Sequence, residues 1–192
     1  MRVGIYCGSK TGRNPIYAEK AEELGIFLAK HDIGIVYGGS NQGIMGKVAD
    51  AALSNNGNVV GVMPSFLQWK EVTHEHITEL HYVTTMYERK AKMIALADLL
   101  IALPGGAGTM DEFFDVLTLS QIGQHQKPIC LYNVNNYYRL LRLQLQHMAD
   151  EGFMQQEQLE NIFIIQKPEE LLEIIHKKII MQEGSCPDDY LG

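Results

Sequence analysis

The sequence predicts an α/β fold with a doubly wound, mostly parallel, Rossmann-like sheet and helices on both of its faces. Short runs rich in Val, Ile and Leu alternate with longer segments of helical periodicity, which is typical of parallel strands joined by crossover helices. Glycine-rich loops follow three of the short runs, as expected where a parallel sheet binds a ligand at its carboxyl edge. Together these patterns predict about six strands and six helices.

Each expected strand is a short apolar run, and each expected helix is a longer segment between such runs. The strands are expected at 3–7, 34–37, 59–63, 99–103, 129–132 and 162–165. The helices are expected at about 15–31, 43–55, 87–97, 109–122, 137–150 and 168–181. Asn14 before Pro15 supports the first helix start, because asparagine caps helices and proline is tolerated in the first turn. Pro168 supports the start of the last helix in the same way.

Two threonine–glutamate pairs, each three residues apart, predict capping boxes at helix starts. Thr85 with Glu88 is one, so we expect Glu88 to cap a helix rather than to catalyse. Thr109 with Glu112 is the other. For Glu112 both readings stay open, because a carboxylate in the first turn of a helix at a ligand-binding edge would also face the ligand.

Residues 64–86 interrupt the alternation, and we expect a long loop with a short helix or strand lying over the sheet. Trp69 in this loop could pack or stack on a ligand. His74 and His76 form a His-x-His pair, but a metal needs more ligands than this pair offers, so we expect no metal site.

The chain of 192 residues is 46% hydrophobic, which suits a single domain. We expect a nucleotide-binding domain over 1–183 and a polar tail over 184–192. The distant cysteines Cys7, Cys130 and Cys186 predict neither a disulfide framework nor a zinc site, and a reducing, cytoplasmic location fits them. No leader sequence or membrane span is expected. A net charge of −7 argues against a nucleic-acid polymer as partner but allows a small anionic ligand.

The three glycine-rich loops lie where expected strands lead into expected helices, at 8–13, 38–43 and 104–109. Glycine lets the backbone approach an anion closely, and the N–H groups of the following helix donate to it. One such loop alone could equally serve helix–strand packing, but three together favour an anionic ligand. None of them is a Walker or GxGxxG sequence, so a nucleoside triphosphate or a dinucleotide is not indicated. Arg89, early in the third helix, offers a rigid fork of donors for an anion, although a helical arginine can simply be solvated.

In these motifs the chain resembles the LONELY GUY (LOG) family, the cytokinin riboside 5'-monophosphate phosphoribohydrolases that were once named lysine decarboxylases. Residues 104–112, PGGAGTMDE, match the family's PGGxGTxxE, and Met86 with Arg89 and Lys90 matches its Met-x-x-Arg-Lys. The first two glycine-rich loops match as well, and the likeness runs from Val3 to about Ile180.

The resemblance implies a homodimeric hydrolase without cofactor, with Arg89 and Glu112 as its catalytic pair. The residues expected to bind substrate, from the loops and the resemblance together, are Ser9, Gly38, Gly39, Glu71, Met86, Lys90, Gly105, Gly106, Ala107, Gly108, Thr109, Asp111 and Thr118. The chain departs from the family at position 107, often aromatic there, at position 111, often Glu, and at Tyr87 and Glu88, which replace a histidine or glutamine.

The expected reaction is hydrolysis of the N-glycosidic bond of a nucleoside 5'-monophosphate, AMP or an N6-modified AMP, to free base and ribose 5-phosphate. Two alternatives stay open. A non-catalytic nucleotide carrier could use the same loops without cleaving the ligand. An amino-acid decarboxylase, as the older family name suggests, would need pyridoxal phosphate on a lysine.

Overall fold

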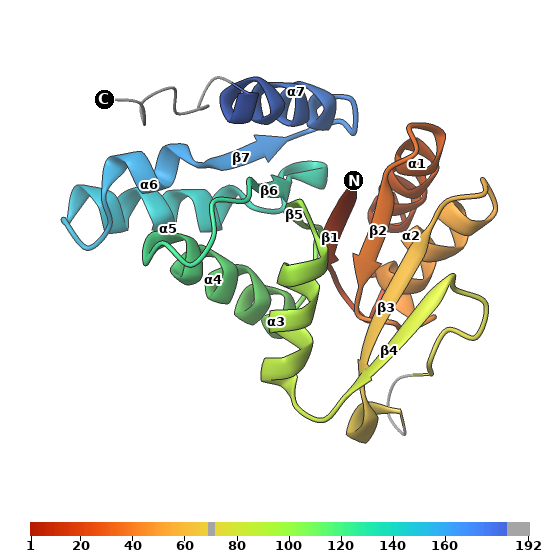
Figure 1. Cartoon of the computed structure of the whole chain (residues 1–192). Coiled ribbons are helices and arrows are strands. Elements are labelled where there is room, and N and C mark those ends of the chain that lie inside the picture. The colour runs from red at the N-terminus through yellow and green to blue at the C-terminus, as the bar shows by residue number, and fades with distance from the viewer. Residues whose placement is uncertain (69–71, 184–192) are drawn as a thin grey trace, which may run out of the picture.

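The structure, a computed structural model, describes residues 1–68 and 72–183, and side chains as far as residue 177. Its centre is a seven-stranded parallel sheet in the order β4-β3-β2-β1-β5-β6-β7 (Figure 1). The strands are β1 (Arg2–Tyr6), β2 (Gly34–Tyr37), β3 (Val59–Pro64), β4 (Glu79–Val83), β5 (Leu99–Ala102), β6 (Ile129–Tyr132) and β7 (Ile162–Ile165). The predicted α/β class and parallel sheet are confirmed.

Helices cover both faces of this sheet, as predicted (Figure 1). They are α1 (Ile16–Lys30), α2 (Gly43–Leu53), α3 (Met86–Leu96), α4 (Ala107–Gln121), α5 (Arg139–Asp150), α6 (Gln156–Glu160) and α7 (Glu170–Glu183), with 3-10 turns η1 (Ser65–Leu67) and η2 (Val134–Asn136). Side chains of α1, α2 and α7 form one buried cluster with the sheet, and those of α3, α4 and α5 form the other. None of the described helices is long and apolar enough to cross a membrane.

Successive residues of the central strands supply the two cores alternately. In β2, for example, Ile35 belongs to the cluster with α1, and Val36 belongs to the cluster with α3. Both side chains are fully buried. A strand buried on both faces has a continuous apolar sequence, and for this reason the sequence predicts these strands correctly.

The strand order reverses at β1. The chain steps from β1 to β2, β3 and β4 in one direction, and α3 then carries it back to β5 on the other side of β1. The loops after β1 and β5 therefore leave the sheet beside each other and diverge, and this is the place where doubly wound sheets bind ligands.

The segment 64–86 differs from the prediction. It contains η1 and the strand β4, which extends the sheet beside β3 in the register Val60–Glu79 to Pro64–Val83 instead of lying over it. Because β4 is an edge strand whose residues are partly or fully exposed, it mixes polar and apolar residues. The short helix α6 was likewise not predicted.

The helix starts were predicted with mixed success. Asn14 was predicted as the N-cap of α1, but Pro15 holds that position and Asn14 lies just before it. Its Oδ1 still accepts a hydrogen bond from the backbone N–H of Ile16 at 3.1 Å. The side chain of Thr85 caps α3 as predicted, accepting from the N–H of Glu88 at 3.1 Å. The capping box predicted at Thr109 is wrong, because α4 begins at Ala107 with Gly106 as its N-cap, and Thr109 lies buried inside the first turn.

Candidate functional site

The loops after β1, β2 and β5 meet at the carboxyl edge of the sheet. The backbone N–H of Gly8 donates to the carbonyl of Pro104 at 3.2 Å, which joins the first and third loops. The N–H of Ile44, in the first turn of α2, donates to the carbonyl of Gly8 at 3.1 Å, which joins the second loop to the first. The predicted convergence of the three glycine-rich loops is therefore present in the fold.

A cavity of about 660 Å³ opens where these loops meet, a volume within the range of small-molecule sites. Its walls come from the first and third loops and from the starts of α1, α2, α3 and α4, together with η1. The lining residues are Cys7, Gly8, Ser9, Lys10, Thr11, Gly12, Tyr17, Ile44, Met45, Phe66, Leu67, Met86, Arg89, Pro104, Gly105, Gly106, Ala107, Gly108, Thr109, Asp111, Glu112 and Tyr137.

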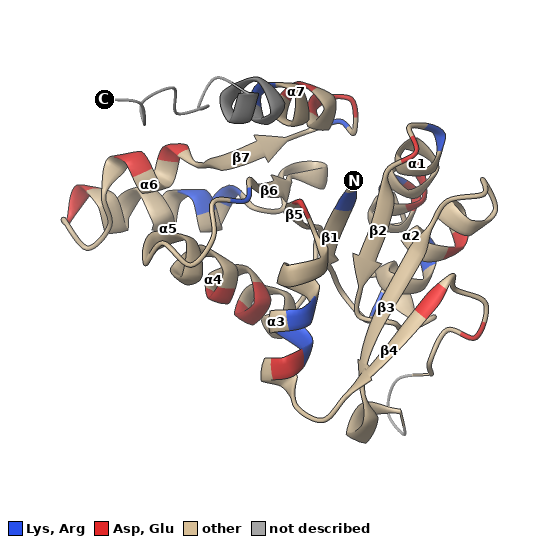
Figure 2. Ribbon diagram, viewed as in Figure 1, with Lys and Arg blue, Asp and Glu red and all other residues tan. Residues whose placement is uncertain are grey.

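Arg89 and Glu112 meet in this cavity from two different helices. Nη2 of Arg89, on α3, lies 3.8 Å from Oε1 of Glu112, on α4, and the two side chains are only 7% and 9% exposed. Basic residues of α3 thus lie beside acidic residues of α4 (Figure 2). Charged groups held together at a nearly dry surface interact strongly with each other and with any charge that develops on a ligand.

Gly38, at the end of β2, makes room for the guanidinium of Arg89. A Cβ atom on Gly38 would lie 1.9 Å from Nη2 of Arg89 and 2.9 Å from Sδ of Met45. On its other side Arg89 contacts Met86, whose Sδ lies 4.0 Å from Nη1. Gly38 does not itself line the cavity, so its part in the site is to seat the arginine.

For the hydrolysis expected from the sequence, Gly38→Ala should lower kcat/KM about tenfold, because displacing a group that is expected to be catalytic by even 1 Å is costly. The measurement is the rate of base release together with the thermal unfolding midpoint. The same substitution in an Arg89→Ala background should change the rate less than about twofold, since coupling needs both partners. Equal losses in the two backgrounds would show that Gly38 acts without Arg89.

The first turn of α4 presents backbone donors to the cavity. Gly106, Ala107 and Gly108 are exposed there, and the first N–H groups of a helix have no acceptor within the helix. Gly105 is tightly enclosed, because a Cβ atom on it would lie 2.0 Å from Oγ1 of Thr109 and 2.9 Å from the backbone nitrogen of Gly8. A helix start of this kind, rich in glycine and open to solvent, is suited to bind an anion.

Lys90 does not line the cavity. Its Nζ lies 3.4 Å from Asp111 and 3.3 Å from Asp115, both on α4, and 5.7 Å from the ring centre of Tyr87. Burial alone would lower the pKa of Lys90, but hydrogen bonding and attraction to Asp115 and Asp111 outweigh it and raise that pKa. The lysine therefore stays charged and ties α3 to α4, with Asp111 between it and the cavity.

Several other predicted site residues lie outside the cavity lining. Gly39 follows β2 behind Gly38, and Thr118 is exposed on α4, well past the first turn. Glu71, together with Trp69, lies outside the described residues. The other predicted residues all line the cavity together with Arg89 and Glu112, the predicted catalytic pair; they are Ser9, Met86, Gly105, Gly106, Ala107, Gly108, Thr109 and Asp111.

Tyr6 and Tyr37, at or near the ends of β1 and β2, are both buried. Burial is the main reason why the pKa of Tyr6 is raised, and the carboxylates of Glu112 and Asp115 raise it further, against the opposing effect of Arg89. Tyr6 therefore stays protonated beneath the site. His74 is also structural, since its Nε2 lies 2.9 Å from Oδ1 of Asp50 and its Nδ1 accepts from the N–H of His76.

The sequence did not indicate seven cavity residues from outside the glycine loops: Cys7, Tyr17, Ile44, Met45, Phe66, Leu67 and Tyr137. For Tyr137, its place in the sequence could have indicated a position near the site. It follows β6, which pairs with β5, so its segment leaves the same edge of the sheet as the Pro104–Thr109 loop. Phe66 and Leu67 could not be placed in this way, because η1 lies in the segment whose structure was predicted wrongly.

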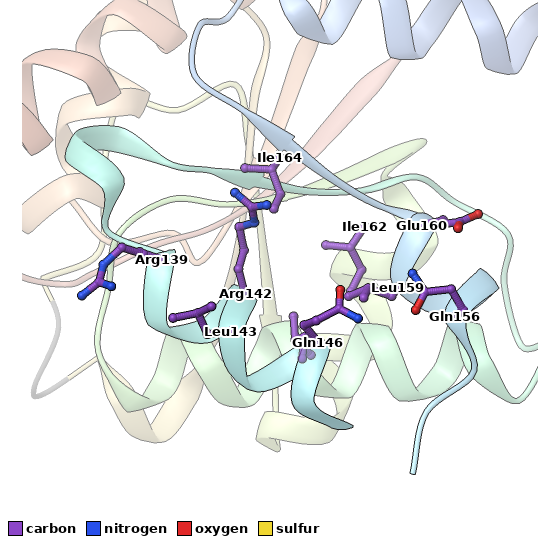
Figure 3. A pocket seen from close by; sticks show the side chains of 10 residues that line it. Arg139, Arg142, Leu143, Gln146, Gln156, Leu159, Glu160, Ile162 and Ile164 are labelled. Atoms are coloured by element: carbon purple, nitrogen blue, oxygen red, sulfur yellow. The ribbon is translucent and has the colours of Figure 1, made fainter. Parts of the chain in front are cut away.

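A second cavity, of about 450 Å³, lies between α5, α6 and β7 (Figure 3). Arg139, Arg142 and Glu160 line it beside apolar residues such as Leu143 and Ile162. None of the residues predicted to bind substrate or to catalyse borders this cavity. The candidate site is therefore the first cavity, at the reversal of strand order.

Comparison with known proteins gives a family match. The family model described as "Possible lysine decarboxylase" matches residues 45–175, which include α3, the third glycine loop and α4. A cytokinin riboside 5'-monophosphate phosphoribohydrolase of Rhodococcoides fascians is 48% identical over 153 residues, covering 79% of this chain and 77% of that protein. A probable one of Oryza sativa subsp. japonica is 36% identical over 201 residues, covering 98% and 82%.

Solved structures with the same fold belong to more distant proteins. The molybdenum cofactor binding protein from the phototrophic bacterium Rippkaea orientalis superposes with a TM-score of 0.69 at 20% identity, covering 93% of this chain and 96% of that one. The Moco carrier protein from Chlamydomonas reinhardtii gives a TM-score of 0.70 at 17% identity, covering 94% and 98%. At such low identity the likeness establishes the shared fold alone.

Proposed function

Because the chain belongs to the LOG family, the family of the cytokinin riboside 5'-monophosphate phosphoribohydrolases, we propose that it hydrolyses the N-glycosidic bond of a nucleoside 5'-monophosphate. The products are a free base and ribose 5-phosphate. The observation that carries this function is the pair of Arg89 and Glu112, held 3.8 Å apart in the cavity beside an open helix start.

The 5'-phosphate binds at the start of α4. The backbone N–H groups of residues 106–108 donate to its oxygens, and the positive end of the helix dipole favours its charge. Glycine at positions 106 and 108 leaves this surface unobstructed, since a Cβ atom at either would have no neighbour within 4 Å. The phosphate thereby fixes the ribose next to the second turn of α4, where Glu112 lies.

Glu112 stabilises the reacting sugar. Breaking the bond between C1' and the base nitrogen leaves positive charge on the ribose ring, as in glycoside hydrolysis. The carboxylate offsets that charge and accepts a proton from the water whose oxygen bonds to C1'. Its low exposure strengthens both effects, because little solvent screens it.

Arg89 assists the departing base. When the C1'–N bond breaks, the bonding electrons go to the base nitrogen, and a guanidinium donor there stabilises the developing negative charge. The proton taken from water ends on the base. Gly38 and Met86 hold the guanidinium in place for this contact.

The base binds toward η1. The third loop follows β5 and η1 follows β3, so three strand spacings, about 14 Å, separate these ends of the cavity at the sheet edge. Phe66 and Leu67 of η1 and Met86 offer apolar contacts suited to a flat ring at that end. Such a lining accepts adenine or an N6-modified adenine.

The test is a screen of purified protein against AMP, isopentenyl-AMP and the other common nucleoside monophosphates, with free base measured by chromatography. We expect release of base and an equal amount of ribose 5-phosphate from at least one of the adenine nucleotides. Tight binding of several nucleotides without release of base would contradict the hydrolase function and favour a nucleotide carrier. Release of carbon dioxide from an amino acid would favour a decarboxylase.

We also propose that the protein is a cytoplasmic homodimer. A dimer formed through α3 and α4 would cover Tyr87 and Ile122, which are 80% and 63% exposed on or next to these helices. Cys7 and Cys130 are buried and form no disulfide, which suits a reducing cytoplasm. Light scattering coupled to size-exclusion chromatography measures the assembly, and a mass of a single chain of 21.6 kDa would contradict the dimer.

A further inference from the structure

We propose that Tyr137 is a positioning residue that orients the phosphate-binding backbone of the third loop. The proposal rests on the proposed function only in assuming that the ligand carries a phosphate. The hydroxyl of Tyr137 donates to the carbonyl oxygen of Gly105 at 2.5 Å, and its ring borders the cavity. Gly105 immediately precedes the N-cap of α4.

The hydrogen bond fixes the direction of a phosphate donor. In a trans peptide the carbonyl of one residue and the N–H of the next point in opposite directions. Holding the carbonyl of Gly105 toward Tyr137 therefore turns the N–H of Gly106 away from the tyrosine. A Cβ atom on Gly106 would meet none of the described residues within 4 Å, so on the Gly106 side they put little restraint on this peptide, and the hydrogen bond to Tyr137 adds one.

Tyr137 is itself held from several sides. The adjacent residue, Tyr138, is buried and donates its hydroxyl to the carbonyl of Leu103 at 2.6 Å, so consecutive tyrosines bind two carbonyls of the strand end and loop after β5. Oδ1 of the buried Asn133 accepts from the N–H of Tyr138 at 2.8 Å. The ring of Tyr137 also packs edge-on against Tyr17, with ring centres 5.7 Å apart. Because these contacts hold Tyr137 in place, its hydroxyl can restrain the position of the third loop.

The test is Tyr137→Phe, which keeps the ring and removes only the hydroxyl. Calorimetric titration with ribose 5-phosphate and, separately, with adenine gives two dissociation constants that do not depend on turnover. We expect Kd for ribose 5-phosphate to rise about three- to tenfold, the usual effect of one hydrogen bond, and Kd for adenine to change less than about twofold. In turnover, KM for a nucleoside monophosphate should rise by the same factor with kcat little changed.

The matched control is Tyr82→Phe on β4, the same chemical change at an exposed position outside the cavity lining. It should leave both constants unchanged. An unaltered Kd for ribose 5-phosphate in Tyr137→Phe would overturn the proposal, and so would equal weakening of both ligands, which indicates a general structural role. If the expected binding pattern is found in a protein that releases no base, the hydrolase function fails and the positioning role stands.

Discussion

Glu112→Gln is expected to lower kcat for base release by about 10²-fold or more, because the amide neither offsets the charge on the sugar nor accepts a proton from water. The side chain keeps its size, and the site proposed for the 5'-phosphate at the start of α4 does not include it. We therefore expect Kd for ribose 5-phosphate to stay within about twofold of the unmodified protein. Stopped assays of free base and calorimetric titration measure the two quantities.

Glu88→Gln is the matched control for this substitution. Glu88 lies at the exposed start of α3, where its Oε2 accepts a hydrogen bond from the N–H of Thr84 at 2.7 Å, and the amide oxygen of glutamine can still accept it. Its kcat should remain within about twofold. A Glu112→Gln protein as active as this control would remove the carboxylate from the proposed reaction.

Arg89→Ala is expected to reduce kcat/KM by about 10²- to 10³-fold, the range seen when a donor to a developing charge is removed. It also removes the cation 3.8 Å from the buried carboxylate of Glu112, so we expect a lower thermal unfolding midpoint as well. Arg89→Lys separates the two effects. It restores a cation and most of the stability, but it lacks the planar fork, and its kcat/KM should stay about tenfold or more below that of the arginine.

Arg142→Ala serves as the control for loss of an arginine. This residue lines the second cavity, beside α6 and β7, and lies outside the proposed site (Figure 3). Its kinetics should match those of the unmodified protein. If Arg89→Lys regained full activity, a simple positive charge would suffice and the proposed directional contact with the base would be wrong.

The sequence predicts those elements of the fold whose burial produces a clear pattern of apolar residues. Strands such as β5 are buried on both faces and stand out as apolar runs between helical segments. The strand β4 does not stand out in this way, because it is an edge strand with Glu79 and Tyr82 exposed and so has no continuous apolar run. The start of α4 was misplaced for another reason. Threonine three residues before glutamate resembles a cap, but here the backbone turns into the helix at Gly106 and leaves its first N–H groups open.

The site could be predicted where the chemistry depends on residue type and loop position. Glycine after three strands, an arginine and a glutamate near helix starts were all visible in the sequence. Contacts between distant segments were not. Two such contacts depend on how α3 packs against β2 and α4. Gly38 seats Arg89, and Lys90 binds Asp115 instead of bordering the cavity.

Because the strand order reverses at β1, different parts of the cavity are lined by different segments of the chain. Arg89, the loop proposed to bind phosphate and Glu112 all belong to the continuous unit α3-β5-α4, although Gly38 at the end of β2 seats the arginine. Phe66 and Leu67 come from the half of the sheet on the other side of β1. If η1 contacts the base as proposed, exchange of residues 65–67 between homologues should alter which nucleobase is accepted and leave the proposed catalytic pair in place. In this arrangement base preference could change through η1 with little change to Arg89 and Glu112, whereas a change at Met86, which contacts Arg89, would affect both.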